Sequence, residues 1–353
     1  MRSIKLPSWS KRLLGFAPLP SPPHVFALDE TRLRYGQLAA DRQGLRLRAF
    51  RQLALPPDSF QNGPLGGPLR DPGAFRELVA AILADLPGGV REASLVIPDG
   101  WLRVTYAESG DLPRGGAALD EVLRWKLRRL VPFRVDELRI GAAEVSPLPG
   151  QEEPRRLLMG FAIEQLLAQL EDAFAAQGVR LGQISNFSLS LLDALAPAAA
   201  KAPAPRFASM SGASAAEVAR GRSSFMALAL VTDDGYALIF ARRGEPVLHR
   251  YKAAPSPAAA DTSPGGSVVR DLRLTRNFLD ENFPGSALES VLLLAPPQLE
   301  PIWLDRLQQG LGRRAAVVDG AVLPPLRSED GFTPVPPWRE VAPMIGAARR
   351  MVA

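Results

Sequence analysis

Two short acidic turns contain the carboxylates and the glycine of this chain that lie between apolar strand patterns. The first turn follows an apolar strand pattern and contains Asp29; the second lies between two more apolar patterns and contains Asp233, Asp234 and Gly235. Glycine in such a turn lets backbone N–H groups approach a phosphate closely. The simpler interpretation is that Asp favours turns without any ligand. The residue types therefore allow a phosphate site but do not require one.

No other group of catalytic or metal-ligating residues occurs in the sequence. The chain has no cysteine, which excludes disulfides, thiolate metal sites and a thiol nucleophile, and which suits a reducing compartment. His24 and His249 are far apart, and neither has a partner at the spacing of metal ligands. There is no P-loop, no Gly-x-Ser-x-Gly elbow and no His-Glu-x-x-His motif. We therefore predict no catalytic residue and no metal site.

The composition is that of an ordinary globular protein. A chain of 353 residues, 46% hydrophobic and 22% charged, is long enough for two domains with full cores. The net charge of +5 is modest and comes from arginines spread over the whole chain, so nucleic-acid binding is not expected. No apolar run approaches the ~20 residues that a membrane-spanning helix needs. These features predict a cytoplasmic protein.

Residues 1–23 form a basic and apolar arm ahead of the first strand pattern. Its basic residues alternate with aromatic and aliphatic ones, among them Arg2, Lys5, Trp9, Lys11 and Arg12. Such a segment could rest on an anionic membrane surface through residues 1–16. Alternatively, it is a terminus that packs on its own domain. No cleavable apolar core follows, so we do not expect a secretory signal.

The stretch 119–145 has the clearest local pattern. Apolar residues at steps of three and four predict a helix with one buried stripe, formed by Leu119, Val122, Leu123, Leu127 and Leu130. Pro132 should end this helix, because its ring excludes a further turn. After Asp136 and Glu137, rough alternation of apolar and other residues predicts a half-buried strand over 138–145.

This helix, corner and strand resemble a segment of the PilM family of type IV pilus assembly proteins. The resemblance rests on Trp125, on the pair Pro132 and Phe133, and on the run Asp-Glu-Leu at 136–138. It implies an α/β actin-like fold, as in the cell-division protein FtsA, with a small α+β subdomain inserted into the first half. It also implies a partner, because the family binds the cytoplasmic N-terminal peptide of the membrane protein PilN in a groove beside that subdomain.

The order of the expected elements supports the same architecture. In the first half, strands over 25–28, 33–38 and 45–53 precede a helix that starts after Asp71 and a strand over 93–97. In the second half, strands over 225–231, 236–241 and 247–251 precede a helix over 268–283, a strand over 290–294, a helix over 302–311 and a strand over 315–318. Three strands, a helix and a parallel strand form the unit of ribonuclease-H-like folds. Two such units predict a duplicated actin-like fold.

Domain boundaries follow from these patterns. We predict an arm over 1–23, a first domain over 24–196, a linker rich in Ala, Pro and Ser over 197–224, a reduced second domain over 225–338, and a C-terminal helix over 339–353 that packs on the first domain. The inserted subdomain is expected at about 103–150. A strand over 157–162, a helix and a strand over 179–187 should then form a right-handed parallel crossover in the first domain, followed by a short helix to 196.

The resemblance also shows what this chain lacks. Actin-like ATPases hold phosphates with two turns of the form Asp-x-Gly-Ser/Thr, whereas the first turn here reads Asp29, Glu30, Thr31 and Arg32. No Ser/Thr run follows Gly235, the Gly-rich turn on the adenosine side is Ala-Pro-Pro at 295–297, and the short stretch 253–266 replaces a helical subdomain. We therefore interpret the residues of the two turns as vestiges of a nucleotide site: Asp29, Asp233, Asp234 and Gly235. We expect a pseudo-ATPase that uses neither ATP nor Mg²⁺.

A dense group of cations occupies the helix and corner of the inserted segment: Arg124, Lys126, Arg128, Arg129 and Arg134. One interpretation is a solvated helix face, since Arg is common throughout this chain. The other is that Trp125, Arg128, Arg129, Phe133 and Arg134 flank a groove in which an extended partner peptide docks.

Together these features predict a non-catalytic scaffold at the inner face of the inner membrane. It would belong to a type IV pilus or a related secretion platform and bind a PilN-like membrane protein, while contacts with pilus motor ATPases and self-association stay open. One alternative is a nucleotide-binding actin-like ATPase. The other is a cytoplasmic component of a type II secretion system resembling GspL, which normally continues into a spanning helix that this sequence does not show.

Overall fold

The computed structural model describes most of the chain. The described residues are 23–41, 44–63, 65–84, 86, 89–109, 112–113, 116–145, 156–200, 224–242, 244–253, 266–283, 287–318, 326–328 and 338–349. The predicted arm lies outside them, apart from residue 23, and so do residues 201–223 of the predicted linker. None of the helices in the described ranges is both long and apolar enough to span a membrane.

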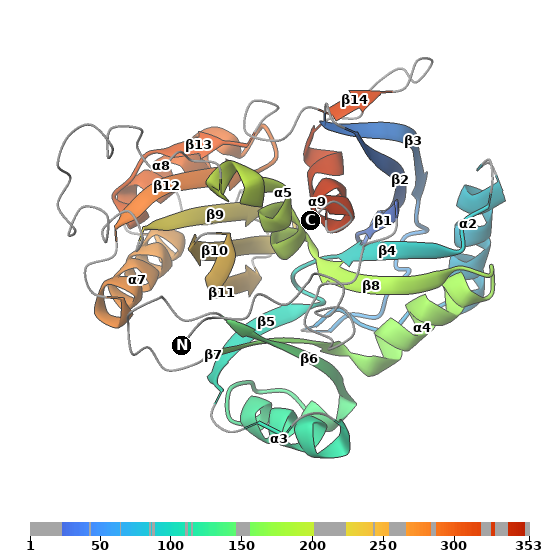
Figure 1. Ribbon diagram of the computed structural model, residues 1–353, viewed down its shortest axis with the longest axis horizontal. Coiled ribbons are helices and arrows are strands. Elements are labelled where there is room, and N and C mark those ends of the chain that lie inside the picture. Colours follow the sequence, from blue (N-terminus) through green and yellow to red (C-terminus); the bar gives the residue numbers. More distant parts are fainter. Residues whose placement is uncertain are drawn as a thin grey trace, which may run out of the picture.

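The first half forms a six-stranded sheet. Its strands are β1 (His24–Leu28), β2 (Arg32–Asp41), β3 (Gly44–Ala54), β4 (Glu92–Ile97), β8 (Arg180–Asn186) and β14 (Leu326–Ser328), in the order β14-β3-β2-β1-β4-β8 (Figure 1). The predicted antiparallel meander is confirmed in β1 to β3, and β4 and β8 run parallel to β1. Helices α2 (Pro72–Ala84) and α4 (Glu164–Ala175) cover the outer face of this sheet. Asp71 caps α2 as predicted, because its Oδ1 accepts the N–H groups of Gly73 and Ala74.

The second half repeats this arrangement as a five-stranded sheet. Its strands are β9 (Phe225–Val231), β10 (Gly235–Arg242), β11 (Glu245–Ala253), β12 (Leu288–Leu294) and β13 (Ala315–Val317), in the order β11-β10-β9-β12-β13. Helices α7 (Ser267–Asn282) and α8 (Glu300–Leu311) pack on its outer face. The meander, helix and parallel strand that the sequence predicts twice are therefore present twice, and the duplicated α/β fold is confirmed.

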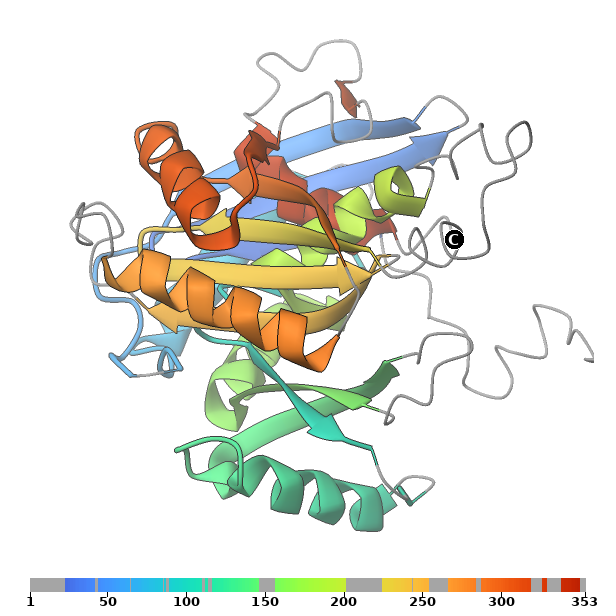
Figure 2. The ribbon, with the colours of Figure 1, turned by 90° about the vertical axis from the view of Figure 1, so that its left-hand side faces the viewer.

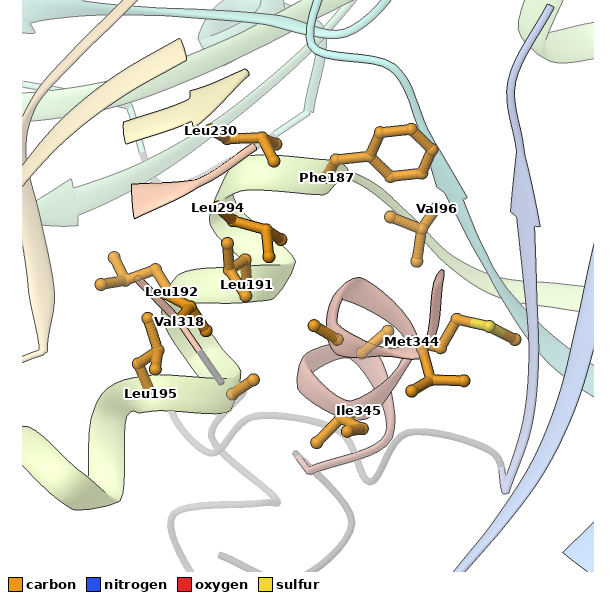
Figure 3. Packing of buried hydrophobic residues seen from close by; sticks show 14 of the residues in the cluster. Val96, Phe187, Leu191, Leu192, Leu195, Leu230, Leu294, Val318, Met344 and Ile345 are labelled. Atoms are coloured by element: carbon orange, nitrogen blue, oxygen red, sulfur yellow. The ribbon is translucent and has the colours of Figure 1, made fainter. Parts of the chain in front are cut away.

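Two helices fill the space between the sheets. These are α5 (Phe187–Ala200) and α9 (Trp338–Arg349), and Figure 1 shows both between the two halves. Side chains from both sheets and both helices meet in one continuous core (Figure 3). The helices touch backbone to backbone, because a Cβ on Gly346 would lie 1.4 Å from the carbonyl oxygen of Ser190. Helix α9 packs on the sheet of the first domain, and it also contacts the second half through this core.

Two predicted domain boundaries need correction. Helix α5 continues to Ala200, so residues 197–200 are helical and do not belong to a linker. Strand β14 falls within the predicted second domain but pairs in parallel with β3 of the first sheet. A strand of three residues is too short to produce a recognisable alternating pattern in the sequence.

The inserted subdomain is a three-stranded antiparallel sheet covered by one helix. Strands β5 (Arg103–Glu108), β6 (Leu138–Val145) and β7 (Arg156–Ile163) have the order β5-β7-β6. Helix α3 (Gly116–Arg128) packs on one face, and the 3-10 turn η1 (Val135–Glu137) leads into β6. Figure 2 shows the subdomain below the two main sheets, with α3 on the side turned away from them.

The strand β7 was predicted correctly but assigned to the wrong sheet. It pairs with β5 and β6 and not with β8, so the subdomain extends to Ile163, beyond the predicted limit near residue 150. The expected crossover from 157–162 into 179–187 is therefore absent, and the parallel connection runs from β4 through the whole subdomain and α4 to β8. Half of β7 is buried against α3, and this gave it the apolar pattern of a main-sheet strand.

The register of α3 is nearly as predicted. Leu123 and Leu127 are buried, and Leu119 and Val122 are partly buried. Leu130 is 47% exposed, so its place on the buried stripe is wrong. The helix ends at Arg128, ahead of Pro132, and a tight turn beyond it points Leu130 into solvent.

The buried position of Leu127 gives the first prediction. Leu127→Asp places a carboxylate in the fully buried subdomain core and should lower the free energy of unfolding by roughly 3–5 kcal/mol. Arg128→Ala is the matched control, because the neighbouring side chain is largely exposed and has only a 3.4 Å contact with Asp136. Urea titrations of both variants measure the difference. Equal stability of the two variants would contradict the packing of α3.

Candidate functional site

The first acidic turn uses its carboxylate to hold itself together. Asp29 Oδ1 accepts hydrogen bonds from Thr31 N (2.8 Å), Thr31 Oγ1 (2.7 Å) and Arg32 N (3.0 Å). Its other oxygen pairs with the guanidinium of Arg34. Both oxygens therefore have partners within the hairpin, as in an ordinary Asx turn.

The second acidic turn is also engaged internally. Thr232 Oγ1 donates to Asp234 Oδ1, and Tyr251 donates its hydroxyl to Asp234 Oδ2 at 2.9 Å. Gly235 is required by packing, because a Cβ there would lie 2.3 Å from the carbonyl oxygen of Lys252. Asp233 is exposed. Three of the four predicted vestigial residues thus have structural roles that involve no ligand.

The two turns face one another across the junction between the halves. Partial burial, the charge of Asp234 and the charge of Asp29 together raise the pKa of the Glu30 carboxyl. The side chain of Arg103 reaches the same place, with its guanidinium carbon 5.1 Å from the centre of the Tyr251 ring. Burial and the charge of Asp234 raise the pKa of Tyr251, so its hydroxyl remains a donor at physiological pH. The carboxylates of Asp29, Glu30 and Asp234 and the side chain of Arg103 thus lie between the turns.

A buried polar cluster next to these turns was not predicted. Ser188 donates its backbone N–H (3.1 Å) and its hydroxyl to the carboxylate of Asp99, and His249 Nε2 lies 2.9 Å from Ser188 Oγ and 3.2 Å from Asp99 Oδ1. The three residue types are those of a hydrolase triad. However, all three are buried, and the serine hydroxyl is committed to the aspartate and not to the histidine. No short motif could have indicated this cluster, because its members are separated by 61 to 150 positions in the sequence.

No metal centre is present in the described ranges: they contain no cluster of three or more His, Asp or Glu residues suited to a metal ion.

The predicted partner-binding residues lie on the outer side of the subdomain. Trp125 is 55% exposed, and the Arg129 guanidinium sits 5.3 Å from the centre of its ring. Arg128 pairs with Asp136 and Arg134 with Glu137, so these two cations are compensated. Phe133 packs toward Phe161 in the subdomain core. The structure brings these residues together around α3, but none of them lines the groove described next, and their role stays a prediction.

A groove of about 500 Å³ lies on the other side of the subdomain sheet, between that sheet and the first domain. Strand β6 forms one side and strand β8 the other. Each is the last strand of its sheet, so within the described part of the chain each has one edge without a paired strand. An open strand edge presents a row of backbone N–H and C=O groups to whatever lies in the groove.

Small residues keep the groove open. Gly141 on β6 and Gly160 on β7 are direct partners in the sheet, and both face away from α3. A Cβ on Gly141 would meet no atom within 4 Å, and one on Gly160 would meet only Leu102, at 3.8 Å. Leu158 and Ala143 extend this apolar floor. No pattern in the sequence indicated the groove, because glycines that leave space are not recognisable as a site before the strands are paired.

An ion-pair network ties the β6 side of the groove to the first domain. The guanidinium of Arg139 donates to Glu164 Oε2 at 2.9 Å and to Glu171 Oε1 at 2.6 Å, and both acceptors belong to α4. These hydrogen bonds raise the pKa of Arg139, and the bond from Arg139 lowers the pKa of Glu164. The network places a fixed set of charges beside the apolar floor.

No model of a known protein family matches the chain, and no curated protein sequence matches it. Among solved structures, it is similar to the PilM–PilN type IV pilus biogenesis complex, with a TM-score of 0.68 and 14% identity over 94% of this chain and 98% of that chain. It also matches the cytoplasmic domain of EpsL, an inner-membrane component of the type II secretion system of Vibrio cholerae, with a TM-score of 0.42 and 11% identity over 93% of each chain.

A third match is a Bacteroides thetaiotaomicron protein with an actin-like ATPase fold and unknown function, with a TM-score of 0.44 and 8% identity over 89% of this chain and 94% of that one. The first of these similarities covers nearly the whole of both chains, and at 14% identity it concerns the fold. The chain therefore has the α/β actin-like fold of PilM, as the resemblance around Trp125 and the duplicated element order predicted.

Proposed function

We propose that this protein is a non-catalytic scaffold of a type IV pilus or related secretion platform, acting at the inner face of the inner membrane. In this proposal the groove between β6 and β8 binds an extended cytoplasmic peptide of a PilN-like membrane protein. The observation that carries the proposal is the groove itself, which joins two open strand edges over an apolar floor. The solved complex of similar fold contains a partner named PilN, which supports the choice of partner.

The chemistry of the groove fits a peptide better than a small polar metabolite. An extended peptide can add as a strand to an open edge, where backbone hydrogen bonds supply affinity and alternate side chains supply specificity. Gly141, Gly160 and Leu158 offer room for apolar side chains. Arg139 and Glu171 at the margin offer polar partners.

The absence of ATPase activity is the second part of the proposal. Phosphate binding needs free backbone N–H groups and a positive environment. Here the N–H groups of Thr31 and Arg32 are taken by Asp29, and the negative charges of Asp29, Glu30 and Asp234 lie close together. These features oppose the binding of a triphosphate between the turns.

Filling the groove should abolish peptide binding without unfolding the protein. Gly141→Leu projects a side chain into open space, so the fold should persist while a peptide loses its place on the floor. Ala118→Leu is the control, because this exposed residue of α3 does not line the groove. We expect Gly141→Leu to weaken, by roughly tenfold or more, the binding of a synthetic peptide from the cytoplasmic terminus of the adjacently encoded single-pass membrane protein. Calorimetry measures both affinities.

The same peptide tests the alternative site around α3. A triple variant with Arg128, Arg129 and Phe133 changed to Ala should bind the peptide as tightly as the parent. Loss of binding in a folded triple variant, with binding retained in Gly141→Leu, would place the partner on the α3 side and contradict the groove.

Calorimetry with Mg-ATP tests the pseudo-ATPase proposal. We expect no heat of binding at micromolar protein and nucleotide, because the donors of the first turn are already used. Asp233→Ala provides the check, since this exposed side chain can be removed without unfolding the turn. Micromolar binding by the parent that Asp233→Ala abolishes would overturn the proposal and favour a nucleotide-binding ATPase.

A further inference from the structure

A buried asparagine joins the two walls of the groove at its inner end. Asn186, the last residue of β8, has no exposed surface. Its Oδ1 accepts a hydrogen bond from the backbone N–H of Leu189 at 3.0 Å, so Asn186 caps the N-terminus of α5. Its Nδ2 donates a hydrogen bond to the carbonyl oxygen of Leu102 at 3.0 Å. Leu102 immediately precedes β5, the first strand of the subdomain. The side chain of Asn186 therefore links the start of the subdomain to the end of β8 and the start of α5.

The second domain contacts α5 one residue away from this link. His249, on β11, reaches Ser188 Oγ at 2.9 Å and Asp99 Oδ1 at 3.2 Å. The hydroxyl of Ser188 donates to Asp99, so both neighbours present acceptor oxygens to the imidazole. The network therefore assigns the ring proton to Nε2. Nδ1 is left buried without a hydrogen-bond partner among the described residues.

The second domain also contacts the first residue of β5. The guanidinium carbon of Arg103 lies 5.1 Å from the centre of the Tyr251 ring and 5.6 Å from the centre of the Phe133 ring. Tyr251 belongs to β11 of the second domain, and Phe133 belongs to the corner of the inserted subdomain. Arg103 thus packs between two parts of the protein that the chain does not connect directly.

These contacts lie immediately beside the groove. Leu102 and Val104, which flank Arg103, line the groove on the subdomain side. Ser185 and Leu189, which lie on either side of Asn186 and Ser188 in the sequence, line it on the side of the first domain. Ser188, which His249 contacts, and Arg103, which packs against Tyr251, are thus each adjacent in sequence to a groove-lining residue.

We propose that the second domain sets the width of the groove, with His249 and Tyr251 holding its two walls and Asn186 joining them. His249 and Tyr251 are positioning residues in this arrangement and do not touch the peptide. The inference rests on the proposed function only in its prediction of the affinity for the peptide. Since coupling between sites is reciprocal, a peptide that needs this width must also strengthen the contact of the second domain with the walls.

Spin-label distances measure the width without any peptide. The chain has no cysteine, so Arg91→Cys on the first domain and Glu121→Cys on the subdomain, both exposed, can be labelled selectively. We expect one narrow distance distribution in the otherwise unchanged protein. His249→Phe removes the donor to Ser188 and Asp99 and should broaden or shift it. His249→Gln keeps an N–H donor and should restore the narrow distribution.

Two more variants separate this role from general stability. Asn186→Asp keeps an acceptor that caps α5 but loses the donor to Leu102, so it should broaden the distribution as His249→Phe does. Tyr236→Phe removes a 2.8 Å hydrogen bond to Asp271 elsewhere in the second domain and should leave the distribution unchanged. If the parent protein binds the peptide, His249→Phe and Asn186→Asp should each lower the affinity for it by roughly fivefold or more. Tyr236→Phe should leave the affinity unchanged.

The outcomes distinguish the two proposals. An unchanged distance distribution in His249→Phe would overturn the inference, whether or not the peptide binds. Equal broadening in Tyr236→Phe would also overturn it, because a general loosening would then explain the effect. A selective broadening in a protein that does not bind the peptide would support the inference about the groove and contradict the proposed function.

Discussion

The hydrophobic core between the two sheets is the constraint on which the rest of the structure depends. Helices α5 and α9 lie between the sheets, and Gly346 lets their backbones meet at a distance that any side chain would prevent. The two sheets contribute inward-facing residues to this one core, among them Val96 from the first and Leu230 from the second (Figure 3). Separating the halves would expose apolar surface on both, which costs roughly 25 cal/mol for each Å². The junction is thus a packed core rather than an open hinge.

This junction determines what the protein can do. His249 of the second half reaches across it to Ser188 and Asp99 of the first half. The acidic turns beside it are held by their own hydrogen bonds. A groove lies instead between the first domain and the inserted subdomain, where two strand edges border it. A rigid body with such a groove is suited to the peptide binding proposed above.

The sequence predicted the parts of this account that depend on local pattern. Periodicity located the helices and strands of both halves, and the segment around Trp125 indicated the family fold. It misplaced β7, because a strand pattern does not say which sheet the strand joins. It missed the groove and the cluster around Asp99, since both are formed by residues that only the fold brings together. The sequence pattern also placed Leu130 on a buried stripe. That was wrong, because α3 ends at Arg128, before the proline at 132 that was expected to end it.

Native-state hydrogen exchange tests most directly whether the two halves form one body. Strands β4 and β9 lie in different sheets, but side chains of both face the same core. The account predicts that their slowest amides exchange through one opening, with the same free energy and the same denaturant dependence. If β9 exchanged through an opening of clearly lower free energy while β4 stayed protected, the second half would open on its own, and the claim that the two halves form one rigid body would be wrong.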